Sequence, residues 1–344
     1  MLLEELSNAF GPSGNEDEVR RLLARALKDK VDELSTDALG NLIAFKQGSG
    51  PSPRLKVMVD AHTDEVGLMI TRFEKNGLLG FQAVGGISDR LLLAKGVVVG
   101  EKQLPGVITA PPIHLTKRSQ RKKAITIDQL TIDIGASSED EAKKLVKVGD
   151  YVTFDTRFQV LTKDGPRTVK GKAFDDRVGC AVAAALADEK YEVDVYLAFT
   201  VQEEVGLRGA RVAAYHIDPD VAFALEGTVC DDTPKKEDTS PTTELGKGPA
   251  ITVMDRSFFA DKRLVRLLVD TAESEGIAYQ FKQPGVGATD AGAIHLTKAG
   301  VPAVTLAVPC RYIHTPVGML SLNDYDSSVS LMRAVLHALP EKWT

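Results

Sequence analysis

The sequence predicts an α/β fold in which a mixed sheet is sandwiched by helices and a small β-rich domain is inserted. Short apolar runs typical of buried strands alternate along much of the chain with amphipathic stretches of helical period. Between residues 66 and 164 this alternation stops, and closely spaced strand-like runs punctuated by Gly and Pro take its place. We therefore expect a discontinuous larger domain, residues 1–65 and 165–344, around an inserted domain, residues 66–164.

The first elements expected along the chain are a helix and a pair of strands. Ser13 and Glu16 have the spacing of a capping box, and apolar residues with helical spacing follow them. A strand pair is expected within residues 31–45, with Leu39–Asn41 as its turn. Residues 48–53 are rich in Gly, Ser and Pro, which predicts a surface loop.

The inserted domain is expected to contain short strands and one helix, at about residues 139–146. The strand-like runs are Gly67–Phe73, Leu78–Val84, Gly96–Gly100, Gly106–Thr109, Thr131–Ile134 and Tyr151–Phe154. The basic run Lys117–Lys123 has no flanking aromatic residues, so we expect a solvated loop rather than a nucleic-acid or membrane patch. A position at a peptide entrance is a third possibility for this run.

The last third of the chain again alternates strand and helix, as a sheet with crossovers should. Asp261–Glu275 has the apolar stripe of a helix, and a final helix is expected with Asn323 as its cap. Gly285–Gly292 lacks the lysine of a phosphate-binding loop, which argues against nucleotide binding. Lys235–Asp238 mixes charges of both signs and predicts another exposed loop.

Acidic and histidine side chains follow several of the apolar runs. These runs are Leu55–Asp60, Val193–Val201, Asp220–Leu225 and Ala303–Val308. The side chains after them are His62 and Asp64, Glu203 and Glu204, Glu226, and His314. Asp175 and Asp176, just before the helical run Val178–Leu186, add a further acidic pair. Because the carboxyl ends of parallel strands meet at one crevice in open α/β sheets, we expect these groups to converge.

The types of residue in this set indicate a metal site. Glu203 and Glu204 would repel each other unless a cation or a proton lay between them. Carboxylates together with His62 and His314, two of only six histidines, are ligands suited to Zn²⁺ or Co²⁺. Asp64 could accept the free ring N–H of His62 and fix its tautomer. A single histidine or Glu-Glu pair is more simply explained as structural or solvated, but the combination favours a metal site.

Seven segments of the sequence resemble the tetrahedral aminopeptidases, a family of dinuclear metallopeptidases that includes glutamyl and leucyl aminopeptidases. The segments are FGPSGNE (10–16), DAHTDEVGLMI (60–70), KAFDDRVG (172–179), QEEVGLRGA (202–210), ALEGT (224–228), GATDAGAI (287–294) and RYIH (311–314). They extend from Phe10 to His314, so the resemblance covers almost the whole chain. It implies a mixed-sheet metallopeptidase domain with an inserted domain for assembly and substrate access.

The resemblance implies two divalent metal ions per subunit, Zn²⁺ or Co²⁺, with Mn²⁺ also possible. The implied ligands are His62 and Glu226 for one ion, Glu204 and His314 for the other, and Asp175 as the bridge between them. Asp176 is the rival for the bridging position. Some members of the family carry Asp where this chain has Glu226, so the longer side chain could bind the metal differently.

The resemblance also implies a metal-dependent aminopeptidase that hydrolyses the N-terminal residue of short peptides. Glu203 is the implied general base, which takes a proton from a metal-activated water and later gives it to the leaving amine. Asp64 orients His62, while Thr289 and Asp290 are expected to line the substrate pocket. Family members assemble through the inserted domain, so a homo-oligomer is expected, with dimers building a dodecamer.

Composition limits the possible partners and location. The chain has 344 residues, 43% of them hydrophobic and 26% charged, which is ordinary for a soluble globular protein. The net charge of −6 argues against a nucleic-acid partner, and three scattered cysteines argue against a disulfide framework. No signal segment and no apolar run near the ~18 residues of a membrane helix are seen, so we expect a cytoplasmic protein with no membrane partner.

Three other functions stay open from the sequence. Paired carboxylates can hydrolyse glycosides without a metal, as in an endoglucanase, but that mechanism leaves His62, Asp64 and His314 without a role. A deacylase or carboxypeptidase could use the same dinuclear centre on an N-blocked substrate. A metal-stabilised scaffold without chemistry would give Glu203 no purpose.

Overall fold

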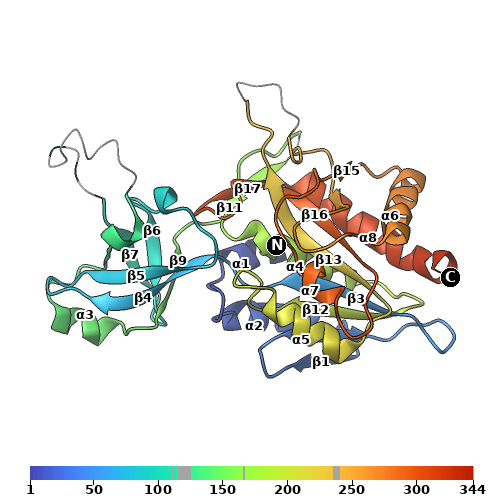
Figure 1. The fold of residues 1–344 in the computed structure, drawn as a ribbon, viewed down its shortest axis with the longest axis horizontal. Coiled ribbons are helices and arrows are strands. Elements are labelled where there is room, and N and C mark those ends of the chain that lie inside the picture. The colour runs from blue at the N-terminus through green and yellow to red at the C-terminus, as the bar shows by residue number, and fades with distance from the viewer. Residues whose placement is uncertain (111, 113, 115–124, 166, 235–240, 344) are drawn as a thin grey trace.

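The computed structural model describes residues 1–343 except 111, 113, 115–124, 166 and 235–240. The predicted loops Lys117–Lys123 and Lys235–Asp238 lie outside these described residues. Figure 1 shows a large α/β body and a smaller β-rich body beside it. The chain passes into the smaller body after the strand that ends at His62 and returns to the larger body before residue 168.

The larger body is built on a mixed sheet that has 11 strands within the described residues. In spatial order the main path is β1 (Glu33–Thr36), β2 (Leu42–Lys46), β12 (Asp194–Thr200), β3 (Lys56–His62), β13 (Val221–Cys230), β16 (Ala303–Arg311), β17 (Gly318–Ser321), β11 (Thr168–Gly171) and β10 (Gln159–Val160). Off this path, β14 (Ala250–Thr252) pairs with β16 and with β15 (Gln280–Phe281). The neighbours β12, β3, β13 and β16 are parallel, so their carboxyl ends lie at one edge.

Helices cover both faces of this sheet. One face packs against α1 (Leu2–Asn8), α2 (Asp17–Leu27), α4 (Phe174–Leu186), α6 (Lys262–Glu275) and α8 (Leu322–Lys342), and the other against α5 (Arg208–Ile217) and α7 (Ala291–Ile294). Alternate residues of a strand point to opposite faces. Accordingly, Val57 and Val59 of β3 join the first core and Met58 joins the second. The predicted α/β fold with a mixed sheet between helices is confirmed.

The smaller body is a closed barrel with its own core, which includes Leu68, Leu79 and Ile132. Its strands are β4 (Gly67–Phe73), β5 (Leu79–Val84), β6 (Gly96–Val99), β7 (Leu104–Ile108), β8 (Ile132–Asp133) and β9 (Tyr151–Phe154). Helix α3 (Glu139–Leu145) and the 3₁₀ turns η1 (Asp89–Leu91) and η3 (Ile127–Gln129) complete it. The predicted strand-like runs and helix of this region are therefore present.

Three local predictions are wrong. Ser13 and Glu16 do not form a capping box, because helix α2 begins at Asp17 without a side-chain cap and the Ser13 hydroxyl donates to Asp64 instead. The cap of α8 is Ser321, whose hydroxyl accepts from the N–H groups of residues 323 and 324. Strand β13 does not end before Glu226 but continues to Cys230, since it stays paired with β16.

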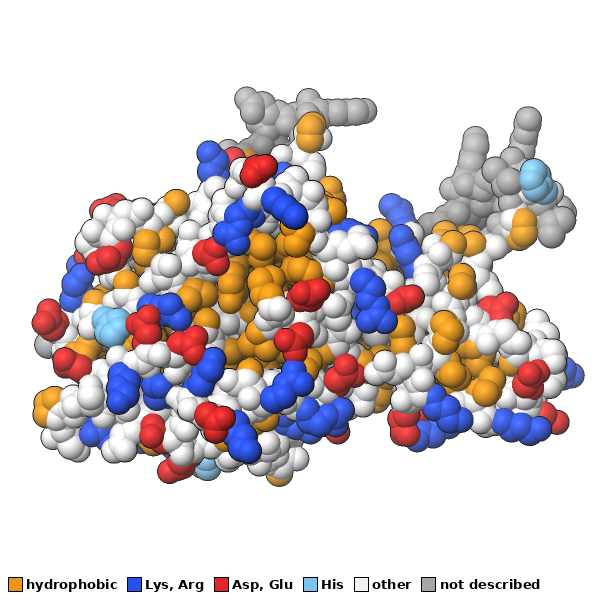
Figure 2. Space-filling view, turned by 180° about the vertical axis from the view of Figure 1, so that it is seen from behind, with side chains coloured by type: hydrophobic (Ala, Val, Ile, Leu, Met, Phe, Trp, Pro, Cys, Tyr) orange, Lys and Arg blue, Asp and Glu red, His pale blue; other side chains and the backbone are white. Residues whose placement is uncertain are grey.

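The surface of the molecule mixes charges of both signs. On the face seen from behind, Lys and Arg side chains alternate with Asp and Glu side chains, and hydrophobic side chains gather near the middle (Figure 2). Within the described part of the chain, no helix combines the length and the apolar character needed to cross a membrane.

Candidate metal centre

The predicted site residues meet at the carboxyl edge of the parallel strands. His62 is the last residue of β3, and Glu203 and Glu204 follow β12. Glu226 projects from within β13, while His314 follows β16. Asp175 lies in the first turn of α4, whose backbone is not helical there. Residues far apart in the sequence thus converge because these strands share one direction.

Asp175 lies between the two histidines. Its Oδ1 is 3.2 Å from His62 Nε2, and its Oδ2 is 3.1 Å from His314 Nε2. Each oxygen of one carboxylate therefore faces a different imidazole. This is the arrangement that a carboxylate shared by two cations requires.

Each histidine also faces a second carboxylate. Glu226 Oε2 lies 3.5 Å from His62 Nε2, and Glu204 Oε1 lies 3.4 Å from His314 Nε2. Glu203 is farther away, with its Oε2 4.0 Å from His62 Nε2. The structure therefore brings His62 close to Glu226 and His314 close to Glu204.

Ligand atoms in two overlapping groups lie within 4.8 Å of one another among the described residues. The groups are His62, Asp175 and Glu204, and His62, Asp176 and Glu226. Asp176 is fully buried, and its Oδ1 accepts the Gly179 N–H at 2.9 Å. A side chain at Gly179 would not fit, because its Cβ would lie 2.4 Å from the Asp176 oxygens. The free Oδ2 of Asp176 makes this residue the second candidate ligand beside Asp175.

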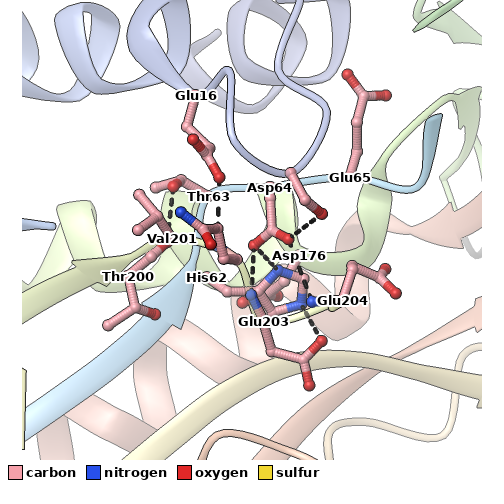
Figure 3. A network of polar contacts seen from close by, with 12 residues as sticks. Glu16, His62, Thr63, Asp64, Glu65, Asp176, Thr200, Val201, Glu203 and Glu204 are labelled. Carbon is pink, nitrogen blue, oxygen red and sulfur yellow. Dashed lines mark hydrogen bonds and ion pairs between the residues drawn. The ribbon is translucent and has the colours of Figure 1, made fainter. Parts of the chain in front are cut away.

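Asp64 connects His62 to the Glu203–Glu204 pair. Its Oδ1 is 3.3 Å from His62 Nδ1 and accepts the Glu203 N–H at 2.9 Å. Its Oδ2 accepts the Glu204 N–H at 3.1 Å and the Ser13 hydroxyl at 2.5 Å. Figure 3 shows Asp64 between His62 and the backbone of the glutamate pair. One buried carboxylate therefore orients a histidine ring and positions two further site residues.

Burial would raise the pKa of Asp64, but the contacts from His62 and Ser13 outweigh it, so this pKa is lowered and the group is ionised. The three glutamate carboxyls of the site behave in the opposite way. Burial, followed by the nearby Asp175 charge, raises the pKa of Glu204 to about 8. Burial likewise raises the pKa of Glu226 to about 7 and that of Glu203 well above its ordinary range.

These shifts agree with a site built for cations. Carboxyls packed this closely resist ionisation unless a positive charge compensates them. Asp176 Oδ2 is a buried polar atom without a hydrogen-bond partner among the described residues. Imidazole nitrogens and carboxylate oxygens are the donors that Zn²⁺ and Co²⁺ prefer. The residues present therefore fit two divalent metal ions.

A cleft of about 510 Å³ opens onto this cluster. Its wall includes His62, Asp175, Glu203, Glu204 and Glu226 of the cluster, together with Thr228, Lys282 and Thr289. Thr289 is thus among the residues that line this cleft. Asp290 lies behind Glu226 rather than on the wall: its N–H donates to Glu226 Oε1 at 3.3 Å, and it accepts the Thr200 hydroxyl at 2.8 Å.

Two residues near the site were not singled out from the sequence. Asp60, at 1% exposure, lies under the cluster beside Asp290, and Lys282 follows the two-residue strand β15. Asp60 carried a usable signal, because an acidic residue inside a buried apolar strand is unusual. Lys282 carried a weaker signal, since β15 is too short to be recognised as a strand.

An α/β sheet with imidazole and carboxylate groups gathered at the carboxyl ends of its parallel strands is typical of a metallohydrolase. Comparison with known proteins assigns the family. Residues 40–331 match the M42 glutamyl aminopeptidases, and the chain belongs to this family.

Individual relatives are similar to this chain over almost its whole length. The lysyl aminopeptidase of Pyrococcus furiosus is 34% identical over 349 residues, which cover 98% of this chain and 96% of that protein. The crystal structure of a TET aminopeptidase from the archaeon Thaumarchaeota archaeon SCGC AB-539-E09 matches with a TM-score of 0.92, 37% identity and coverage of 98% and 96%. The TET1 peptidase of Pyrococcus horikoshii, described as assembling into a tetrahedron or a large octahedral shell, matches with a TM-score of 0.86, 38% identity and coverage of 98% and 99%.

Proposed function

We propose that this metal-dependent aminopeptidase of the M42 family removes the first residue of short peptides, with Glu203 as general base. The position of Asp175 carries the proposal. Its two carboxylate oxygens face His62 and His314, and Glu203 lies near His62. The proposed ligands are His62 and Glu226 for one ion, Glu204 and His314 for the other, and Asp175 between them. Asp175 is preferred to Asp176 as the bridge because Asp176 faces only the His62 side.

Two metal ions bound there would polarise the scissile carbonyl and lower the pKa of a water. The chain supplies the proton transfers. Glu203 faces the cleft without being hydrogen-bonded to either histidine, so its carboxylate is free to take a proton from the attacking water. The raised pKa of Glu203 favours holding that proton until the leaving amine accepts it.

The acidic wall of the cleft also explains action at the N-terminus. Glu203, Glu204 and Glu226 crowd this wall, and a protonated α-amino group of a peptide would find carboxylate partners there. An acetylated amino terminus would lose this interaction. Thr289 is held at the wall by its contacts with Asp255 and Thr305, so we assign it to the substrate pocket.

The identity of the metal, the assembly and the location are parts of the same proposal. Zn²⁺ or Co²⁺ fits the donor set best, with Mn²⁺ as a further candidate. The barrel within residues 66–164 is proposed as an inserted domain for assembly and substrate access, as the shells of the Pyrococcus horikoshii relative suggest, whereas β10 of that range belongs to the larger sheet. Three free cysteines are consistent with the reducing cytoplasm. Native mass spectrometry would test for dimers and a dodecamer.

The test of the activity uses free and N-acetylated aminoacyl chromogenic amides with chelator-stripped protein and added Zn²⁺, Co²⁺ or Mn²⁺. We expect metal-restored cleavage of the free-amine substrates only. Glu203→Gln should lower kcat by about 10²- to 10⁴-fold with unchanged metal content. Glu275→Gln, at an exposed position on α6, is the matched control and should leave kcat unchanged.

Other outcomes would contradict the proposal. Cleavage of acetylated substrates would favour the deacylase alternative. Cleavage that is indifferent to the chelator would remove the metal mechanism and favour a carboxylate pair acting alone, as in glycoside hydrolysis. Full activity in Glu203→Gln would exclude this residue as the base.

A further inference from the structure

The segment that carries Glu203 is held by side chains from three other parts of the chain. Strand β12 ends at Thr200, so its pairing with β3 no longer orders the backbone of residues 201–204. Each of the four N–H groups of this segment donates to a buried side chain instead. In chain order, the acceptors are Asn41 Oδ1 at 3.0 Å, Glu16 Oε1 at 3.2 Å, Asp64 Oδ1 at 2.9 Å and Asp64 Oδ2 at 3.1 Å. In the view of Figure 3, Glu16 and Asp64 both lie above the segment.

Glu16 reaches this segment from the loop before α2. The residue is 5% exposed, and its Oε1 also accepts the Gly14 N–H at 2.6 Å. Gly14 has a φ of +90°, and a Cβ added there would lie 2.5 Å from the hydroxyl oxygen of Tyr151, a residue of β9 in the barrel. The loop is therefore closely packed, and its own backbone holds the carboxylate that accepts from Gln202.

Gln202 has a backbone conformation that needs such support. Its φ is +58°, in the left-handed region, which is disfavoured for residues with a side chain. A conformation of this kind persists where the surrounding contacts enforce it. On the other side of Glu203, the Glu203 carbonyl accepts the N–H groups of Gly206 and Leu207 at 2.8 and 2.9 Å. The backbone at Glu203 is thus held after the residue by a turn and before it by the bond from Gln202 to Glu16.

We propose that Glu16 is a positioning residue for the general base: by accepting the Gln202 N–H, it fixes the direction in which Glu203 faces the cleft. This inference rests on the proposed function of Glu203. Among the described residues, no hydrogen bond or ion pair joins the Glu16 side chain to a proposed metal ligand, whereas Asp64 also contacts His62. A substitution of Glu16 therefore acts on the base and leaves the ligands in place.

The experiment compares three substitutions in the metal-loaded enzyme, with the amide that the parent cleaves best. Glu16→Met removes the acceptor and should lower kcat by about 10²-fold, because a misplacement of about 1 Å can cost that much. KM and metal content should stay close to the parental values. Glu16→Gln keeps an oxygen that can accept both N–H groups and should retain kcat within about fivefold. Glu16→Asp keeps the charge but is too short to reach Gln202, so its kcat should be as low as that of Glu16→Met.

A double-variant cycle tests whether Glu16 acts through Glu203. In the Glu203→Gln background the base is already absent, so Glu16→Met should lower the remaining activity by at most about threefold. A general structural role would give the same loss in both backgrounds. Glu192→Met, at an exposed position before β12, is the matched control and should keep the parental kcat.

Several results would overturn the inference and leave the aminopeptidase function intact. Parental kcat in Glu16→Met, or the same loss in both backgrounds, would show that Glu16 does not act through Glu203. A higher kcat in Glu16→Asp than in Glu16→Gln would show that the charge matters and not the hydrogen bond. A loss of metal that matches the loss of kcat would assign Glu16 to support of the ligands.

The melting temperature of each variant shows whether it is folded. If Glu16→Met does not fold, the order of Glu16→Gln and Glu16→Asp decides, since these two variants keep a polar side chain. Failure of the parent to cleave any amide, or full activity in Glu203→Gln, would remove the proposed function and this inference together.

Discussion

At the scale of single residues, one side chain of the site holds several others in position. Asp64 contacts the ring of His62, the backbone of Glu203 and Glu204, and the hydroxyl of Ser13. It is fully buried, so no solvent could replace these contacts. A change in this one side chain should therefore alter both the metal ligands and the general base.

We expect Asp64→Asn to weaken metal binding by about 10- to 100-fold, because the amide cannot accept as strongly from His62 and leaves one N–H group without its partner. The measurement is a competition titration of the stripped protein with a chromophoric chelator. Asp29→Asn, an exposed substitution of the same kind, should leave the affinity unchanged. An affinity equal to that of the parent would show that Asp64 does not orient the ligand.

The titration of Glu204 and Glu226 predicts how the metal-free protein responds to pH. Folding raises their pKa values from 4.5 to about 8 and about 7, so the folded state binds more protons than the unfolded state. Their contribution to stability is complete below pH 4.5 and is lost as the pH rises through 7 and 8. The melting temperature of stripped protein should therefore fall over this interval.

Thermal denaturation between pH 5 and 9, with and without metal, would measure this effect. Metal ions compensate the carboxylates, so the loaded protein should show a smaller decline. Glu204→Gln should flatten the decline of the stripped protein. A melting temperature that rises with pH in the stripped protein would contradict the assignment.

At the scale of the elements, a buried ion cluster connects the end of β3 to the start of α4. Lys172 Nζ lies 2.6 Å from Glu65 Oε1, and Arg177 approaches the same oxygen at 3.4 Å. Lys172 and Glu65 side chains are each only 3% exposed. Because Glu65 adjoins Asp64 and Lys172 lies three residues before Asp175, this cluster holds Asp64 and Asp175 in position relative to each other.

We expect Lys172→Met to destabilise the protein by about 3–5 kcal/mol, because it leaves the buried Glu65 carboxylate short of a partner. Urea unfolding would measure the loss. Lys163→Met, on an exposed loop, is the control and should have little effect. The double variant with Glu65→Gln should recover part of the loss, and a double variant no better than Lys172→Met would contradict this account.

The elements also show which features a sequence can predict. Strands such as β3 and β12 were predictable because each is an apolar run, and the shared direction of such strands brings His62, Glu203 and Glu226 together. The prediction of a Ser13–Glu16 capping box was wrong because both side chains have tertiary partners. The Ser13 hydroxyl donates to Asp64, and Glu16 accepts the Gln202 N–H. Local patterns cannot reveal such partners, and the two-residue β15, which Lys282 follows, is too short to be detected as a strand.

At the scale of the whole molecule, the two bodies have separate hydrophobic cores. The barrel core contains Leu79, whereas the proposed metal ligands all belong to the larger body. Because a ligand stabilises only the unit that binds it, chelation should lower the unfolding temperature of the α/β body and leave the barrel unaffected.

Differential scanning calorimetry of stripped and loaded protein would then show two unfolding transitions. Only the transition of the α/β body should shift in temperature when the metal is removed. Leu79→Ala should destabilise the barrel by about 2–5 kcal/mol and lower the other transition. A single transition that moves as a whole in both experiments would show that the two bodies unfold together.

The position of the barrel in the chain has a consequence for synthesis on the ribosome. Strand β3 leaves the ribosome early, but its neighbours β12 and β13 follow only after the whole barrel has been made. During that interval both edges of β3 lack the hydrogen-bonding partners of the finished sheet. The barrel closes from its own consecutive segments and can fold first. A nascent chain would therefore carry a folded barrel beside an unpaired central strand, the state in which a holdase chaperone would find its binding site.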